Sequence, residues 1–331
     1  MKLGQRTSEL KDNKITRTDK PKQNLALGVT LMLLGGLGFS MMNLFIRLMG
    51  PDISSVQKMF FRNLFVFLIT LIPLMRLPRG RRNPINNRSD LGYMLLRSVF
   101  GTLGMLANFI AVDLMPIANA SVLNKLSPFF TILFAALFLR ERVNKIQILG
   151  VIISFVGVII LSQPDAGGFT LAYLIPILIG VGGGLFAGAA YTSVRYLGSR
   201  GIKGAFIVTF FAGFSTLALL PYVLLNYTPM NAQQWFYAIL IGLSAVLGQY
   251  GITYAYQYAE PRSISIFDYS TVVFTMILGM LFLEQIPGVY ALIGSGIVFF
   301  AFFIMFIYNH IQAKKEMRLD AEAKALEAKE L

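Results

Sequence analysis

The sequence predicts an all-α integral membrane protein with ten transmembrane helices, arranged as two inverted repeats of five helices each. Three observations carry this prediction: ten long apolar stretches, basic residues gathered between alternate stretches, and a second half that repeats the first. A hydrocarbon core about 30 Å thick requires about 20 apolar residues per helix, and each stretch is long enough to span it.

The composition agrees with a membrane protein. Of the 331 residues, 56% are hydrophobic and 14% are charged, which leaves too few polar groups to cover a soluble globule. The chain has no Cys, and its single His, His310, follows the last apolar stretch. Disulfides, thiol catalysis and Cys-ligated metals are therefore excluded, and we expect neither a metal site nor a cofactor. The membrane accounts for the net charge of +13, so we expect no nucleic-acid partner.

The ten helices follow one another with short connections. In order, we expect them at residues 25–46, 53–75, 90–112, 117–139, 145–162, 170–194, 202–225, 232–258, 262–283 and 287–309. The two tails and the connections after even-numbered helices hold 24 of the 29 Lys and Arg residues. Basic flanks resist translocation, so we expect a multi-pass protein of the cytoplasmic membrane with both termini in the cytoplasm.

The ends of the chain differ from its apolar body. Residues 1–24 form a basic cytoplasmic tail, and residues 310–331 form a charged cytoplasmic tail that either continues the last helix or frays. Contact with anionic membrane lipid contributes about 1 kcal/mol per basic residue near the surface. Between the tails we place the first repeat at 25–163 and the second at 170–309. The sequence leaves the oligomeric state open, with a homodimer as one alternative.

The second half repeats glycine, arginine, proline and serine positions of the first half. An offset of 148 pairs Gly35 with Gly183, Arg47 with Arg195, Gly50 with Gly198 and Pro73 with Pro221. After the longer basic loop, an offset of 144 pairs Gly104 with Gly248, Ser121 with Ser265 and Gly150 with Gly294. Each half has an odd number of helices, so the second half must enter the membrane inverted. Inverted repeats are typical of secondary transporters, whose site lies between the halves near mid-membrane.

A motif runs through the fourth helix and its exit. It comprises Ala120-Ser121-Val122-Leu123, Ser127-Pro128, Leu139-Arg140-Glu141-Arg142, Gln147 and Gly150. This motif resembles the EamA repeat of the drug/metabolite transporter superfamily, and Arg62 and Arg97 resemble arginines common in its first half. The second copy departs from the pattern, because Ser270-Thr271 replaces the Pro. The resemblance covers about residues 26–307 and implies a transporter of small molecules such as amino acids, cofactors or vitamins.

Basic residues inside the apolar stretches are candidate binding residues. A charge within a span costs at least about 2.5–3.5 kcal/mol, so it should face a cavity or a partner. Lys125 is the deepest, and Asn124 and Ser121 extend the polar face around it. Arg62 and Arg97 lie nearer the helix ends. The alternatives to binding are a structural ion pair for Lys125, snorkelling for Arg62 and interfacial anchoring for Arg97.

Three charged residues near helix ends have other expected roles. Lys58 lies one turn from Arg62, near the outer end of the second helix, where its amine either snorkels to the headgroups or points inward. Arg47 has a repeat partner on the opposite side of the membrane, which favours a helix-end packing role. Asp113, at the end of the third helix, is expected to be solvated or to cap the helix.

Asp268 is the one carboxylate clearly inside a predicted span, in the ninth helix. The offset of 144 places it on Asn124, next to Lys125, across the pseudo-two-fold axis. The sequence leaves three alternatives open: a direct ion pair with Lys125, separation of the two charges by a zwitterionic substrate, and proton uptake by Asp268.

Polar and aromatic side chains follow one another on the eighth helix at helical spacing: Gln249, Tyr250, Thr253, Tyr254 and Gln257. Lipid favours none of them in mid-span, so we expect this face to line a cavity. Asn43 and Tyr191 are repeat-equivalent and are expected on the cavity walls of helices 1 and 6. The alternative for each residue is a buried hydrogen bond between helices.

These features favour a secondary transporter that moves a small polar organic metabolite by alternating access. Three of the four most embedded charges are positive, which favours a carboxylate-bearing or zwitterionic substrate such as an amino acid or a cofactor-like compound. An intramembrane enzyme is the alternative, but the chain lacks Gly-x-Ser-x-Gly, a paired-Asp motif, a His in a span and any Cys. We therefore expect no catalytic residues. The inverted repeat disfavours a receptor-like membrane protein.

Overall fold

The computed structural model describes residues 24–76, 85, 87–138, 144–162, 171–258 and 264–330. Every regular element in this part of the chain is helical. Within it, eight helical stretches are long and apolar enough to cross a membrane, and two shorter apolar helices, Lys145–Leu161 and Phe267–Leu283, accompany them. The predicted class, an all-α membrane protein, is confirmed.

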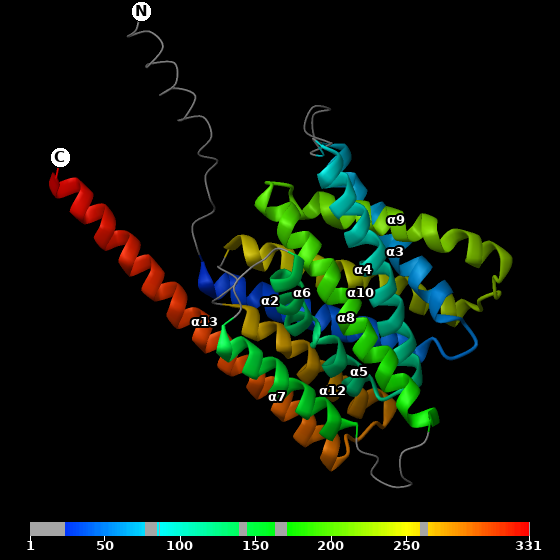
Figure 1. The fold of residues 1–331 in the computed structure, drawn as a ribbon. Helices are drawn as coiled ribbons and strands as arrows, with labels where there is room; N and C mark the ends of the chain where they lie inside the picture. Colours follow the sequence, from blue (N-terminus) through cyan, green and yellow to red (C-terminus); the bar gives the residue numbers. More distant parts are fainter. Residues whose placement is uncertain are drawn as a thin grey trace, which may run out of the picture.

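The first half contains α2 (Leu25–Leu48), α3 (Ser55–Met75), α4 (Arg88–Leu114), α5 (Ile117–Asn124), α6 (Ser127–Phe138) and α7 (Lys145–Leu161). The second half contains α8 (Leu171–Ser199), α9 (Gly204–Leu225), α10 (Ala232–Tyr258), the 3₁₀ helix η2 (Ser265–Tyr269), α12 (Ser270–Leu283) and α13 (Val289–Glu330). Figure 1 shows the helices packed into one bundle, from which the end of α13 projects. The last helix therefore continues through the C-terminal tail, whereas residues 1–23 lie outside the described part.

Polar side chains cap the first helices where the sequence turns from polar to apolar. The side-chain oxygens of Asn24, Ser54 and Asn87 each accept a hydrogen bond from the backbone N–H three residues later, at 3.0, 3.2 and 2.8 Å respectively. Each bond satisfies one of the N–H groups that a helix start leaves without a partner. The caps thus set the beginnings of α2, α3 and α4.

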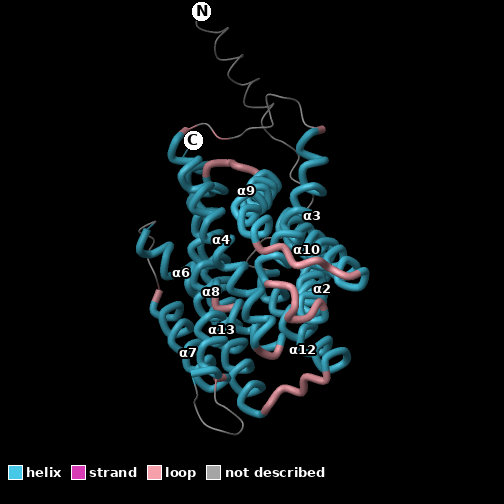
Figure 2. Tube along the Cα trace, turned by 90° about the vertical axis from the view of Figure 1, so that its right-hand side faces the viewer, coloured by secondary structure: helices cyan, strands magenta, loops and turns pink. Residues whose placement is uncertain are grey.

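Helices of the two halves pack in related pairs. Helix α2 packs on α10, and α4 packs on α8. In the repeat α2 corresponds to α8 and α4 corresponds to α10, so these two contacts are equivalent. Likewise α12 packs on α2 and α6 on α8, while α3 joins its own counterpart α9 and α7 joins α13. Figures 1 and 2 both show α7 beside α13. This is the pattern that two similar halves produce around a pseudo-two-fold axis.

Repeat-related glycines lie at two close helix crossings. A Cβ on Gly35 would lie 3.2 Å from the Gly248 carbonyl oxygen, where α2 crosses α10. A Cβ on Gly104 would lie 3.1 Å from the Gly183 carbonyl oxygen, where α4 crosses α8. Small residues let membrane helices approach this closely, and the same four positions are paired by the offsets in the sequence.

The fourth span, Ile117–Phe138, lies where the sequence predicts it, but its helix is interrupted rather than continuous. Helix α5 ends at Asn124, a turn of two residues follows, and α6 begins at Ser127. Pro128 explains the break, because it has no N–H and its ring would clash with the Asn124 carbonyl four residues earlier in a continuous helix. In the first turn of α6 the same residue is tolerated.

The ninth span also departs from one regular α-helix. Its described part begins with the 3₁₀ helix η2, which passes into α12 at Ser270. No proline causes this change, since the second half lacks one here. The offset of 144 aligns Asn124 at the end of α5 with Asp268 in η2. Both halves therefore interrupt their equivalent helix at the same depth in the repeat.

Candidate functional site

A cavity of about 210 Å³ lies at the two interruptions. Its described lining comes from α2, α3, α4, α5, α8, α9, α10, η2 and α12, and so from both halves. The polar lining residues are Asn43, Arg62, Arg97, Asn108, Ser121, Asn124, Lys125, Tyr191, Gln249, Asp268 and Thr271. The larger apolar lining residues are Phe39, Met42, Met105, Phe211 and Ile252.

Lys125 and Asp268 form a direct ion pair in the wall of the cavity. The Lys125 Nζ lies 2.6 Å from the Asp268 Oδ2, and the two side chains are 11% and 25% exposed. The Tyr269 hydroxyl donates to the Lys125 carbonyl at 3.2 Å, which satisfies an acceptor at the broken helix. Among the described residues, the Asp268 Oδ1 is buried without a hydrogen-bond partner. Of the alternatives left open by the sequence, the direct pair is the one present in this structure.

An amide and two hydroxyls connect three helices beside this pair. The Asn43 Nδ2 of α2 donates to the Ser121 Oγ of α5 at 3.1 Å, and this hydroxyl donates to the Thr275 Oγ1 of α12 at 3.2 Å. The Thr275 hydroxyl donates in turn to the Thr271 carbonyl at 2.7 Å. The Asn43 Oδ1 is buried and has no partner among the described residues. Asn43 and Ser121 therefore both line the cavity and hold its walls together.

Arg62 and Arg97 reach the cavity from α3 and α4. They are 1% and 9% exposed, so neither side chain snorkels to the headgroups. The Arg62 Nη1 donates to the Asn63 Oδ1 at 2.8 Å, and the Arg97 guanidinium lies over the Phe211 ring, 4.2 Å from its centroid. Within the described part of the chain, the Nε of each arginine is buried without a hydrogen-bond partner.

The structure does not bring the predicted face of α10 to the cavity. Gln249 lines it, but Tyr250, Thr253 and Tyr254 do not. Tyr250 and Tyr254 stack on each other with ring centroids 5.8 Å apart, and Tyr254 is 44% exposed on the outside of the bundle. The Thr253 hydroxyl donates back to the Gln249 carbonyl of its own helix. The side chain of Gln257 lies outside the described part.

Several lining residues were not selected from the sequence. Asn108 and Thr271 are polar residues within spans, and that property was an available signal for both. Phe39, Met105 and Phe211 could not be predicted as lining residues. Apolar side chains occur alike on the lipid-facing, helix-facing and cavity-facing sides of a membrane helix, so the sequence does not distinguish these positions.

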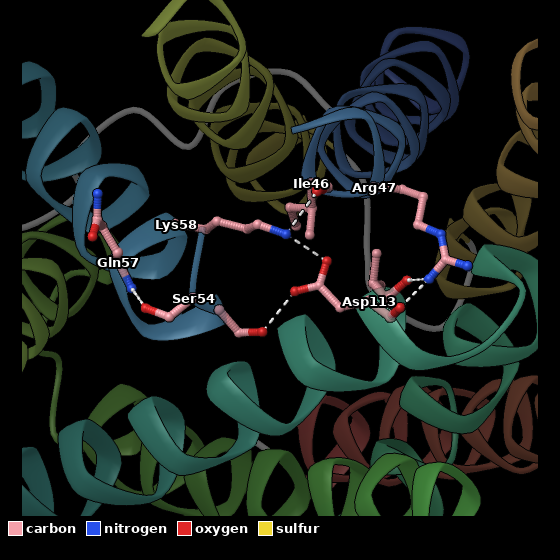
Figure 3. A network of polar contacts seen from close by, with 8 residues as sticks. Ile46, Arg47, Ser54, Gln57, Lys58 and Asp113 are labelled. Atoms are coloured by element: carbon pink, nitrogen blue, oxygen red, sulfur yellow. Dashed lines mark hydrogen bonds and ion pairs between the residues drawn. The ribbon is translucent and has the colours of Figure 1, made fainter. Parts of the chain in front are cut away.

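A second buried ion pair lies away from the cavity, where α2, α3 and α4 meet (Figure 3). The Lys58 Nζ lies 2.6 Å from the Asp113 Oδ1 and donates to the Ile46 carbonyl at 3.1 Å. Ser55 donates to the other Asp113 oxygen at 2.6 Å, and Arg47 donates to carbonyls at the end of α4. The Lys58 side chain is fully buried, so it neither snorkels nor lines the cavity. Asp113 is not merely solvated, and Arg47 has the expected packing role.

The cavity presents ionic, amide and hydroxyl groups. Among the described residues, no group of three His, Asp or Glu side chains lies together as a metal site. This lining can hold a small organic solute by charge and hydrogen bonds, with apolar contact from the aromatic and Met side chains.

Comparisons with known proteins agree with this architecture. The model of the EamA-like transporter family matches residues 26–163 and again residues 174–307. A solved crystal structure superposes with a TM-score of 0.55 over 86% of this chain and 96% of that chain. Its sequence is 14% identical, so this likeness establishes the fold alone.

Curated relatives are named as transporters. An uncharacterized transporter of Helicobacter pylori is 27% identical over 84% of this chain and 95% of its own. The pseudopaline exporter CntI of Pseudomonas aeruginosa is 27% identical over 83% and 94%, and a riboflavin transporter of Rhizobium johnstonii is 28% identical over 89% and 96%. The chain is therefore a multi-pass membrane transporter, not an enzyme, and it belongs to the EamA-like transporter family.

Proposed function

We propose that this transporter moves a small polar organic metabolite that bears a carboxylate, such as an amino acid or a cofactor-like compound, by alternating access. The substrate-binding residues are taken to be the polar lining of the cavity. The named substrates of the relatives differ between an exporter of pseudopaline and transporters of riboflavin, so family membership alone does not select a substrate. The lining of this chain's own cavity is the better guide.

The observation that carries the proposal is a charged cavity at two equivalent helix interruptions. Three basic side chains and one carboxylate line it, although every buried charge opposes insertion into the membrane. Helices broken at the interface of inverted repeats are where secondary transporters bind their solutes. A binding site that both halves share is exposed to either side when the halves rock against each other.

Lys125 and Asp268 contact the substrate in this proposal while they remain close to each other. Their side chains are partly exposed, and the unpartnered Asp268 Oδ1 is free to accept a hydrogen bond from an ammonium or hydroxyl group. Asn124 and Gln249 extend the hydrogen-bonding surface beside the pair. A zwitterion would find a cation and a carboxylate within one site.

The proposed location is the cytoplasmic membrane, with both termini in the cytoplasm. The support is the distribution of Lys and Arg, which gathers in the tails and in the connections after even-numbered helices. The basic N-terminal tail and the charged C-terminal tail then face anionic lipid.

A ligand screen on the purified full chain tests the proposal. A solute that binds only the folded state raises the melting temperature in detergent, so carboxylate-bearing metabolites should stabilise the protein. Those that do should also exchange across proteoliposomes that contain the protein. The proposal is overturned if no carboxylate-bearing solute stabilises the protein, or if those that stabilise it are not exchanged.

A further inference from the structure

We infer that the substrate presents two negative charges to Arg62 and Arg97, either as two carboxylates or as one doubly ionised phosphate monoester. This inference rests on the proposed function and deepens it, because it assigns the arginine pair as the anion subsite of the cavity.

The two arginines are uncompensated in the described structure. Both guanidiniums line the cavity, at 1% and 9% exposure, and neither has a carboxylate within ion-pair distance among the described residues. Their contacts are neutral: an amide oxygen for Arg62 and an aromatic face for Arg97. A buried charge is costly unless it is paired, so the missing partner is the ligand.

The carboxylate in the cavity lining is already engaged. Asp268 is 2.6 Å from Lys125, so these two charges neutralise each other. The three basic side chains and one acid of the described lining therefore leave a net charge of two positive units, and both belong to the arginines. A ligand with one negative charge leaves one guanidinium unpaired, whereas a ligand with two leaves neither.

The two guanidiniums face one cavity. Arg62 from α3, Arg97 from α4 and Tyr191 from α8 all belong to its lining, so a single small ligand there can contact both arginines. The fork of N–H donors on each arginine matches the planar oxygens of a carboxylate or the oxygens of a phosphate. The cavity of about 210 Å³ has room for about seven water molecules at about 30 Å³ each, which limits the ligand to a small metabolite.

Matched ligands that differ only in charge test the inference. We would measure binding by thermal shift to the purified full chain, with straight-chain dicarboxylates from malonate to pimelate, their monoamides, their diamides and glycerol 3-phosphate. At least one dianion should bind about ten- to a hundredfold more tightly than its monoamide. A preference for dicarboxylates identifies two carboxylates, and binding of glycerol 3-phosphate that weakens below about pH 6 identifies a phosphate.

Variants of the arginines locate the effect. Arg62→Gln and Arg97→Gln each remove one charge, so the preference for dianion over monoamide should disappear in either variant. Arg62→Lys keeps the charge and should retain that preference with weaker binding. Arg88→Gln removes an exposed arginine outside the cavity and should bind like the wild type.

Three outcomes overturn the inference, and the first two differ in what they say about transport. If monoamides or zwitterions bind and are exchanged while dianions are not, the two-charge inference fails and the transporter of a carboxylate-bearing solute stands. If no organic acid of any charge binds or exchanges, both fail. Full retention of the dianion preference in both Gln variants also overturns the assignment of the arginines.

Discussion

Two ion pairs with similar geometry inside the helix bundle have different surroundings. Lys58–Asp113 and Lys125–Asp268 both have an N–O distance of 2.6 Å. The first is sealed among helix ends with backbone and hydroxyl partners, whereas the second borders the cavity and leaves one carboxylate oxygen unpartnered among the described residues. This contrast separates a pair that holds helices together from a pair that is available to a solute.

The Lys58 pair should be structural. Lys58→Met leaves the Asp113 carboxylate without its cation and should lower the free energy of unfolding by about 3–5 kcal/mol. Lys58→Met/Asp113→Asn should recover most of this loss, since no charge remains unpaired. Thermal unfolding in detergent measures both effects. Equal stability of the single variant and the wild type would show that the pair contributes nothing.

Breaking the Lys125–Asp268 pair should lower the free energy of unfolding less than breaking the Lys58–Asp113 pair. Lys125→Met leaves Asp268 unpaired, but that side chain is one-quarter exposed, so solvent screens the penalty to about 2 kcal/mol. Lys125→Met/Asp268→Asn should restore the melting temperature. A single variant that loses as much stability as Lys58→Met would mean that the second pair is as sealed as the first.

Gly101 should position Arg97. An added Cβ at Gly101 would overlap the Arg97 guanidinium, which is the movable end of a flexible side chain. Gly101→Ala should therefore leave the fold intact but displace the guanidinium and weaken anion binding by about tenfold. Gly92→Ala is the matched control in the same helix, because a Cβ there meets nothing within 4 Å. Wild-type affinity of Gly101→Ala in the ligand screen would contradict this role.

The charged members of the site could be selected from the sequence, and the aromatic members could not. Lys125, Arg62 and Asp268 can be selected because a charge within a span is costly to insert, which indicates that it has a binding partner or a functional role. The direction of Tyr250 and Tyr254 does not follow from their spacing, since an all-round apolar helix has no strong moment to fix which side faces inward.

At the scale of the helices, the interruptions were the feature that hydropathy missed. A broken span and a continuous one have the same apolar composition and length, so both give the same stretch. Pro128 was a readable signal for the first interruption. The second has no proline, and only its repeat relation to the first gives a reason to expect it.

Substitution by Ala should affect stability differently at different glycines of α8. A Cβ on Gly184 would lie 2.9 Å from the Leu123 carbonyl oxygen, at the end of α5 next to the interruption. Gly184→Ala should therefore push α5 outward and cost about 1–3 kcal/mol of stability. Gly182→Ala, where a Cβ meets nothing within 4 Å, should be neutral or slightly stabilising because Ala favours helix. Equal melting temperatures of the two variants would contradict the close packing.

At the scale of the whole molecule, the lengths of the apolar stretches predicted the number of spans. The paired glycines and prolines predicted that the two halves are similar. The packing of the spans could not be predicted, because the offsets relate residues within a repeat and say nothing of which helices touch. The contacts of α2 with α10 and of α4 with α8 supply this information. The orientation in the membrane stays a prediction from the basic residues.

Labelling of single Cys residues tests this orientation, since the chain contains no Cys of its own. Asn86→Cys, in the basic connection after the second helix and outside the described residues, should be protected from an impermeant reagent in intact cells. Asn226→Cys, at the end of α9 on the opposite face, should be modified. The reverse pattern would place both termini outside the cytoplasm.

The central claim is that the solute crosses through the cavity shared by the two halves. Its most direct test is exchange in proteoliposomes of a ligand found by the screen, measured for two charge-neutral double variants with restored stability. Lys125→Met/Asp268→Asn should lose exchange by at least about tenfold because the pair lines the cavity, and Lys58→Met/Asp113→Asn should keep it because that pair lies elsewhere. Wild-type exchange by the first variant would contradict the claim.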